Sequence, residues 1–197
     1  MSKIRDLITK RRVLMSWLFG LVFVLFSTPP PTVPSKTALL YLIIGLEIAL
    51  LGEALRVWAS GYLYKDESLA INGPFSYTRN PLYLGSFLIG FGFCFASAQP
   101  LLFIAFILFF CVVFIQTIKS EEFALEQKFS GEFAQYKGKV PVFIPSLKAY
   151  ETNVLTEFSW PQVKKNKEYM AVIGVLAVAL YLVIRFLIQY NTSTHVG

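Results

Sequence analysis

A cationic side chain and two adjacent carboxylates stand at the two ends of one long apolar stretch. Arg79 lies just before the stretch, and Glu121 and Glu122 lie just after it. The stretch has two arms, residues 82–98 and 101–118, separated by a short turn. Each arm approaches the roughly 20 residues that a membrane-spanning helix needs. Since two nearly equal arms return the chain to the face it left, we expect the cation and the carboxylates to meet where lipid gives way to water.

The types of these residues suit the binding of a small charged ligand. Asn80-Pro81 favours a helix start, because Asn caps helices and Pro fits the first helical position. The N–H groups of such a helix start, next to Arg79, suit a ligand carboxylate or phosphate. Glu122 falls on the apolar face of a predicted helix, so we expect a cationic ligand or Arg79 to match its charge. The simpler alternative involves no ligand. Asn80-Pro81 would then only start a helix, Arg79 would only anchor the chain at the membrane surface, and Glu121-Glu122 would only end the second arm.

Composition predicts the elements that position these residues. The chain has 197 residues, of which 55% are hydrophobic and 19 are Phe, and its mean hydropathy is +0.58. A soluble domain has about 45–50% apolar residues and no long uninterrupted apolar runs. Five such runs occur here: 13–27, 38–58, 82–98, 101–118 and 169–190. We therefore predict an all-α, polytopic membrane protein with about five transmembrane helices.

The charges predict its orientation. The net charge is +6, but the basic residues flank the apolar runs, so we expect the membrane and no nucleic acid as partner. Basic residues precede the first run, segment 119–168 carries eight lysines, and the tail after residue 190 carries no Lys or Arg. The positive-inside rule then places the N-terminus and the predicted site in the cytoplasm. Nothing marks an endomembrane address, so we expect a bacterial inner membrane.

Metal chemistry is not expected. Cys94 and Cys111 both lie within apolar arms and are predicted to be inert thiols. The one histidine, His195, lies in the tail. A metal site built on His is therefore improbable.

Four motifs follow one another over residues 60–147, and they are specific as an ordered set. They are Gly73-Pro74-Phe75 with Arg79-Asn80-Pro81, Tyr83 and Gly85; Glu121-Glu122 with Leu125 and Phe129; Glu132-Phe133 with Tyr136; and Val140-Pro141 with Ile144-Pro145. This set resembles the isoprenylcysteine carboxyl methyltransferase and phospholipid methyltransferase superfamily of integral membrane methyltransferases. The resemblance covers under half of the chain.

The resemblance implies an S-adenosylmethionine site on the cytoplasmic side of the membrane. It implies catalytic roles for Arg79 and Glu122, and methyl transfer to a lipid or lipid-modified acceptor, either a carboxylate or an amine. The residues that it implies for the cofactor pocket are Leu69, Gly73, Asn80, Pro81, Tyr83, Glu121 and Glu122. The family's usual His is Asn80 here, and Asn cannot titrate, so a general base at this position is excluded.

Three regions are expected along the chain. Residues 1–60 form a two-span N-terminal region, and residues 61–147 carry the cofactor-binding loop, the hairpin and a cytoplasmic helical segment. In that segment, over 119–145, Gly131 is expected to divide two short helices. Residues 148–197 add a linker and a fifth span, with residues 146–168 predicted to be a polar connector.

Two other functions stay open at this point. The motifs also resemble membrane sterol reductases, which would use NADPH, although the adjacent glutamates and the short chain argue against this reading. A non-catalytic membrane protein whose site has decayed at Asn80 is the second alternative. Binding of S-adenosylhomocysteine, of NADPH or of neither would separate the three.

Overall fold

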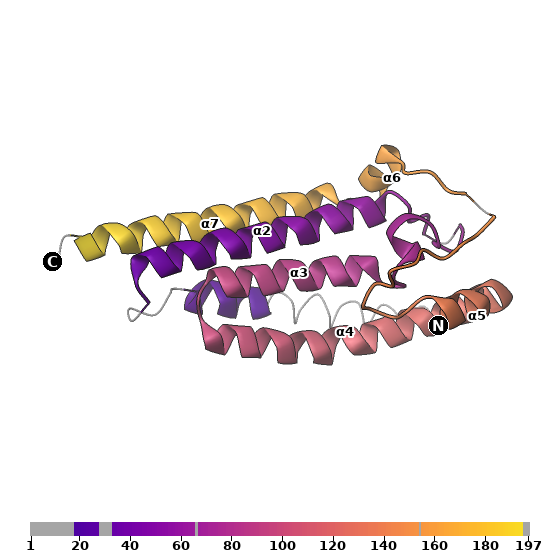
Figure 1. The fold of residues 1–197 in the computed structure, drawn as a ribbon, viewed down its shortest axis with the longest axis horizontal. Coiled ribbons are helices and arrows are strands. Elements are labelled where there is room, and N and C mark those ends of the chain that lie inside the picture. Colours follow the sequence, from indigo (N-terminus) through magenta and orange to yellow (C-terminus); the bar gives the residue numbers. More distant parts are fainter. Residues whose placement is uncertain (1–17, 28–32, 66, 154, 195–197) are drawn as a thin grey trace.

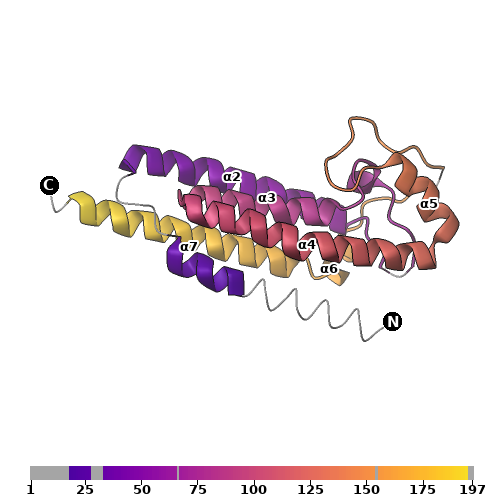
Figure 2. The same cartoon turned by 90° about the horizontal axis from the view of Figure 1, so that it is seen from below.

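The long helices lie side by side with similar directions and make up the bundle, and α5 and α6 lie at one end of it (Figures 1 and 2). The structure is a computed structural model that describes residues 18–27, 33–65, 67–153 and 155–194. Residues 18–26 are helical, and the named elements that follow are α2 (Ser35–Ser60), η1 (Gly73–Ser76), α3 (Pro81–Ala96), α4 (Pro100–Lys128), α5 (Ser130–Lys139), α6 (Trp160–Lys165) and α7 (Tyr169–Thr194). All regular structure in the described part of the chain is helical, which confirms the predicted all-α class.

Membrane-spanning length is clear for three of these helices. α2, α4 and α7 are long and apolar enough to cross a bilayer, and α3 is an apolar helix of 16 residues. At a rise of about 1.5 Å per residue, α3 is about 24 Å long and falls short of a full hydrocarbon core. The polytopic prediction is confirmed. The predicted first span, residues 13–27, lies partly outside the described residues.

α4 is longer than the apolar arm that predicted it. The helix runs on to Lys128, ten residues past the predicted end of the arm, because residues 119–128 contain good helix formers and no Gly or Pro. The predicted break at Gly131 is wrong by two residues. It falls at Phe129, whose φ of −124° and ψ of 42° leave the helical region and end α4 just before α5 begins.

Close approach of α2 and α3 depends on glycine. Gly52 faces Gly85, and Gly45 faces Gly92, so the two backbones meet without intervening side chains. A Cβ added to Gly52 would lie 2.7 Å from the carbonyl oxygen of Gly85. Small residues are the usual means of packing helices in lipid, where apolar side chains gain little from leaving the bilayer.

α3 and α4 meet instead through aromatic rings. The Phe87 ring lies 4.9 Å from that of Phe110, and Phe110 stacks on Phe114 at 4.4 Å. The turn between the helices includes Ala98, whose φ of 51° lies in the left-handed region. The hairpin predicted from the two apolar arms is thus present, and rings fill the space between its arms.

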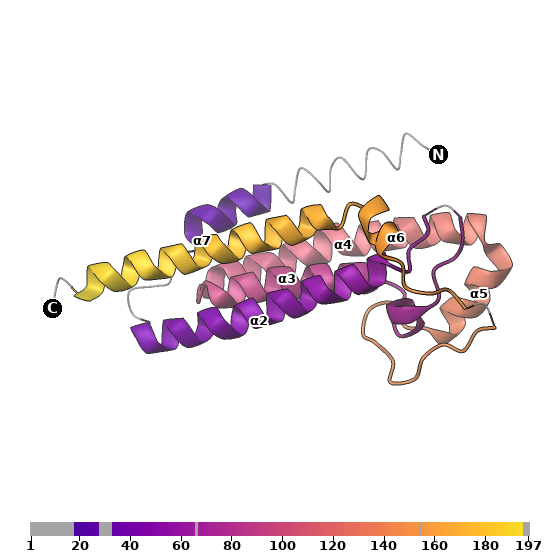
Figure 3. The same cartoon turned by 90° about the horizontal axis from the view of Figure 1, so that it is seen from above.

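Residues 146–168, which were predicted to be a polar connector, are not wholly irregular. They contain α6, which packs against the end of α2: Gln162 Nε2 donates to the Leu63 carbonyl at 2.5 Å, and Asn166 Nδ2 donates to the Ser60 carbonyl at 3.0 Å. The Ser159 hydroxyl caps α6 by accepting the Gln162 N–H at 3.4 Å. α6 thereby fixes where α7 starts, and α7 then runs along α2 (Figures 1 and 3).

Candidate functional site

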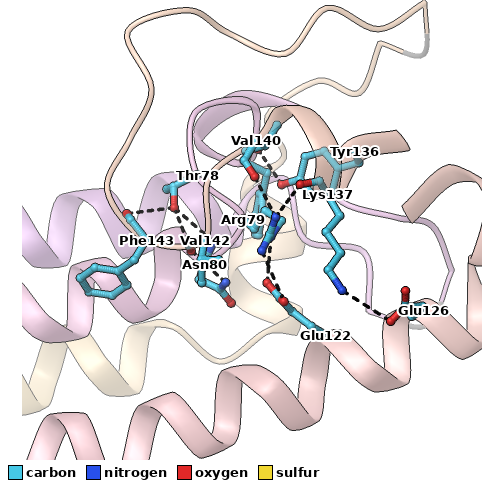
Figure 4. Close-up of polar contacts among 11 residues, drawn as sticks. Thr78, Arg79, Asn80, Glu122, Glu126, Tyr136, Lys137, Val140, Val142 and Phe143 are labelled. Carbon is cyan, nitrogen blue, oxygen red and sulfur yellow. Dashed lines mark hydrogen bonds and ion pairs between the residues drawn. The ribbon is translucent and has the colours of Figure 1, made fainter. Parts of the chain in front are cut away.

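Arg79 and Glu122 form an ion pair at the open end of the hairpin, as the equal arms predicted. Arg79 Nε donates to Glu122 Oε1 at 2.8 Å, and the side chains are only 8% and 15% exposed (Figure 4). The guanidinium also donates from Nη1 to the carbonyl oxygens of Lys137 at 2.7 Å and Val140 at 2.9 Å. Arg79 therefore joins the loop before α3 to α4 and to the end of α5.

A second bridge joins the same two helices. The Tyr83 hydroxyl donates to Glu121 Oε1 at 2.5 Å, and the Tyr83 ring meets Phe114 edge-on at 5.5 Å. Glu121 is exposed, whereas Glu122 is partly buried. The adjacent carboxylates thus occupy different environments, one paired with a phenol and one with a guanidinium.

Asn80 does not use its side chain as a helix cap, so that prediction is wrong. Its Nδ2 donates to the Val142 carbonyl at 3.0 Å, while its backbone carbonyl accepts the N–H groups of Tyr83 and Leu84. Pro81 does take the first helical position and is fully buried. The loss of a side-chain cap is offset by a contact between segments that are 62 residues apart in sequence.

That contact belongs to a clamp, by which we mean residues 77–80 bonded to residues 141–146. The Arg79 N–H donates to the Pro141 carbonyl at 2.9 Å, and the Ser146 N–H donates to the Tyr77 carbonyl at 2.9 Å. The Thr78 hydroxyl donates to the Phe143 carbonyl at 3.0 Å (Figure 4). The clamp holds the segment that carries Arg79 and Asn80 against the chain after α5.

Tyr136 secures the other side of this loop. Its hydroxyl donates to the Phe75 carbonyl at 2.7 Å, and the residue is 2% exposed. Burial raises the pKa of Tyr136 above its ordinary range, so the hydroxyl remains a donor. Phe133 and Val140 form a small core with Tyr136, and Leu69 packs against that core.

Gly73 lies in the same loop, at the start of η1. Its φ of 58° is in the left-handed region that glycine tolerates, and a Cβ there would meet the ring of Tyr62. Its carbonyl accepts the Ser76 hydroxyl at 2.7 Å. Among the predicted site residues, the structure therefore joins Arg79 to Glu122 and Tyr83 to Glu121, while Leu69 and Gly73 shape the loop beside them.

The arrangement can bind a ligand with both a carboxylate and an ammonium group, since it offers one guanidinium and two carboxylates. Arg79 already donates to three acceptors, so a ligand carboxylate would have to take the place of Glu122. Sequence reasoning missed the carbonyls of Lys137 and Val140 and the Thr78 hydroxyl. Residue types do not show which backbone carbonyl will accept a hydrogen bond from a distant side chain. The motif Val140-Pro141 was the one indication that this segment belongs to the site.

The geometry is that of a membrane protein with a polar, charged site at one end of an apolar helical bundle. Residues 38–132 match the family model for phospholipid methyltransferase. This match supports the resemblance of the motifs to the isoprenylcysteine carboxyl methyltransferase and phospholipid methyltransferase superfamily of integral membrane methyltransferases, and so do the relatives.

Relatives in three organisms extend this comparison. The chain is 30% identical to protein-S-isoprenylcysteine O-methyltransferase of Xenopus laevis over 54% of its own length and 41% of the relative's. It is 38% identical to the protein of that name from Saccharomyces cerevisiae over 41% of its length and 34% of the relative's. It is 32% identical to a cobalt-zinc-cadmium resistance protein of Cupriavidus metallidurans over 54% and 49%. The matched segment thus spans less than half the length of each of these relatives.

Proposed function

We propose that this protein transfers a methyl group from S-adenosylmethionine to a lipid or lipid-modified acceptor, on the cytoplasmic face of a bacterial inner membrane. The observation that carries the proposal is the pair of bridges Arg79–Glu122 and Tyr83–Glu121 at one end of the apolar hairpin. They bring complementary charges together at one end of the apolar hairpin, and Arg79, Tyr83, Glu121 and Glu122 all lie within the segment that matches the family model.

Each charged residue has a counterpart in the proposed cofactor. S-adenosylmethionine, when bound, supplies a methyl group on a positively charged sulfur. Arg79 would bind the carboxylate of its amino-acid part, and Glu121 or Glu122 would bind the ammonium group. The Tyr83 ring suits a cation over its face.

The remaining proposed residues would shape the pocket. Leu69 and Gly73 would lie near the adenosine, as the family resemblance implies. Asn80 and Pro81 would fix the start of α3, which the clamp already holds. Pre-positioning of this kind lowers the entropy cost of bringing two reactants together.

Proton transfer depends on the acceptor. A carboxylate acceptor is already deprotonated and needs no base. An amine acceptor must lose a proton, and Glu121 is the exposed carboxylate that could accept it. Asn80 cannot do so, because an amide does not titrate.

Binding measurements on the purified full-length protein in lipid nanodiscs test the proposal. We expect calorimetry to detect S-adenosylhomocysteine and not NADPH, and Glu122→Gln to weaken that binding more than Glu132→Gln, a change at an exposed position on α5. Losing a charge-assisted hydrogen bond costs about 1.5–3 kcal/mol. Binding of NADPH alone would favour a reductase, and binding of neither ligand would favour a non-catalytic protein.

Transfer of a radioactive methyl group identifies the acceptor class. Labelled S-adenosylmethionine is incubated with the nanodiscs and with membrane extracts, and lipids are separated from proteins. Base-labile label indicates a methyl ester, whereas base-stable label indicates a methylated amine. No transfer to either fraction, despite cofactor binding, would contradict the proposed acceptor.

A further inference from the structure

Three apolar side chains after α5 are exposed although they lie outside the spans. Val142 is 42% exposed, Ile144 is 79% exposed and Leu147 is 101% exposed. The chain bends through residues 142–144, with Val142 and Ile144 exposed and Phe143, between them in sequence, partly buried. Lys148, also exposed, follows directly.

The neighbouring residue Phe143 sets the depth of this segment. Its ring lies 5.9 Å from that of Phe87 in α3 and 5.8 Å from that of Phe110 in α4. Phe87 is six residues into α3, so it lies about 9 Å along the helix from its start. Phe143 thus packs on the rings of the apolar hairpin, so its exposed neighbours lie beside the part of the chain that we expect in the bilayer.

The segment is held in this position. The clamp bonds the Val142 carbonyl to Asn80 Nδ2 and the Ser146 N–H to the Tyr77 carbonyl. The Ser146 hydroxyl also donates to the Lys148 carbonyl at 2.5 Å, which closes a tight turn around Leu147. The apolar side chains are therefore presented outward by a fixed backbone, and Figure 3 shows the segment after α5 projecting sideways from the end of the bundle.

We propose that residues 142–148 form an interfacial loop whose apolar side chains insert into the leaflet on the α5 side, with the Lys148 ammonium at the lipid phosphates. We choose the bilayer as the partner of these side chains, because the membrane-spanning helices keep lipid beside the loop at all times. An apolar tip followed by a lysine also matches the boundary between acyl chains and headgroups. The inference does not depend on the proposed methyl transfer, since it rests on position and exposure alone.

Site-directed fluorescence in nanodiscs tests the loop. In a Cys111→Ser background, which removes the exposed native thiol, Ile144→Cys and Leu147→Cys are labelled one at a time with an environment-sensitive dye. Leu155→Cys is the matched control, because Leu155 is 86% exposed but lies between Glu151 and Glu157. Lipids carrying a nitroxide near the headgroup serve as the quencher, and iodide serves as the aqueous quencher.

We expect the dyes at 144 and 147 to be blue-shifted and to lose most of their fluorescence to the nitroxide lipids, with several-fold weaker quenching by iodide than at 155. Quenching at 144 and 147 by iodide alone would overturn the proposal, since the loop would then lie in water. Protection from both quenchers would also overturn it, since the side chains would then lie against protein.

Discussion

At the scale of single residues, the site depends on side chains that donate hydrogen bonds to backbone carbonyls. Asn80 stands where the family has a histidine, and in this structure its amide donates to the Val142 carbonyl. Both Asn and His can donate an N–H to a carbonyl. This shared property explains how the substitution can preserve the fold of the site without preserving a titratable group.

Replacing Asn80 tests that explanation. We expect Asn80→His to keep the melting temperature of the protein close to that of the parent. Asn80→Asp should lower stability by about 1–3 kcal/mol, because it sets a carboxylate oxygen against the Val142 carbonyl at a buried position. Thermal unfolding in detergent, followed by intrinsic fluorescence, measures both. Equal melting temperatures for the two variants would show that the Nδ2 contact contributes nothing.

Replacing Arg79 with lysine should lower the stability of the protein. A guanidinium can donate to Glu122 and to two carbonyls at once, whereas an ammonium on a flexible stem cannot match that geometry. We expect Arg79→Lys to cost about 1–3 kcal/mol of unfolding free energy, measured by denaturant titration in micelles. The control is Lys137→Gln, which breaks a half-exposed 3.6 Å pair with Glu126 and should cost less than about 0.5 kcal/mol.

At the scale of helices, the packing of α2 on α3 leaves no room for side chains at the glycine contacts. We expect Gly52→Val to destabilise the protein by about 1–3 kcal/mol, because its side chain would press on the Gly85 backbone. Gly174→Ala in α7 is the control, since nothing lies within 4 Å of a Cβ there. It should be neutral or slightly stabilising. Residual folded protein after a heat step, measured by size exclusion, would reveal the contrast.

The helices were also the part most open to prediction. Apolar runs predicted α2, α3, α4 and α7, because length and hydropathy are local properties. α6 was missed, although Ser159 followed by Pro161 is a recognisable helix start, because six residues in a polar stretch carry little periodicity. Of the candidate site, the meeting of Arg79 with Glu122 followed from the hairpin. The clamp could not be predicted, because most of its acceptors are backbone carbonyls, which every residue type carries.

At the scale of the whole molecule, the fifth predicted span is attached by buried charge. Arg56 Nη2 lies 2.6 Å from Glu168 Oε1, just before α7, and Arg56 Nε lies 3.8 Å from Glu53 Oε2. The short Glu168 contact is an ion pair that lacks hydrogen-bond geometry. Arg56 Nη1 also donates to the Ser86 hydroxyl at 2.5 Å. One arginine thus ties α2 to α3 and to the start of α7.

Breaking this tie should loosen α7. We expect Glu168→Gln to lower stability by about 1–3 kcal/mol, because the partly buried Arg56 guanidinium loses its nearest counter-charge. Glu67→Gln removes the exposed partner of Lys165 and should cost no more than about 0.5 kcal/mol. Limited proteolysis within residues 150–160, followed by mass spectrometry, reports the release of α7. Equal cleavage rates for the two variants would count against the tie.

The clamp can form only after a delay during synthesis of the chain. Thr78 lies 64 residues before Val142, so the ribosome has to add those residues before the two can bond. At about 5–20 residues per second, this takes roughly 3–13 seconds. During that time Arg79 and Asn80 lack their acceptors, while the hairpin that separates them from residues 141–146 is still entering the membrane. A nascent chain arrested before residue 140 should therefore expose this loop to protease even when its hairpin is fully inserted.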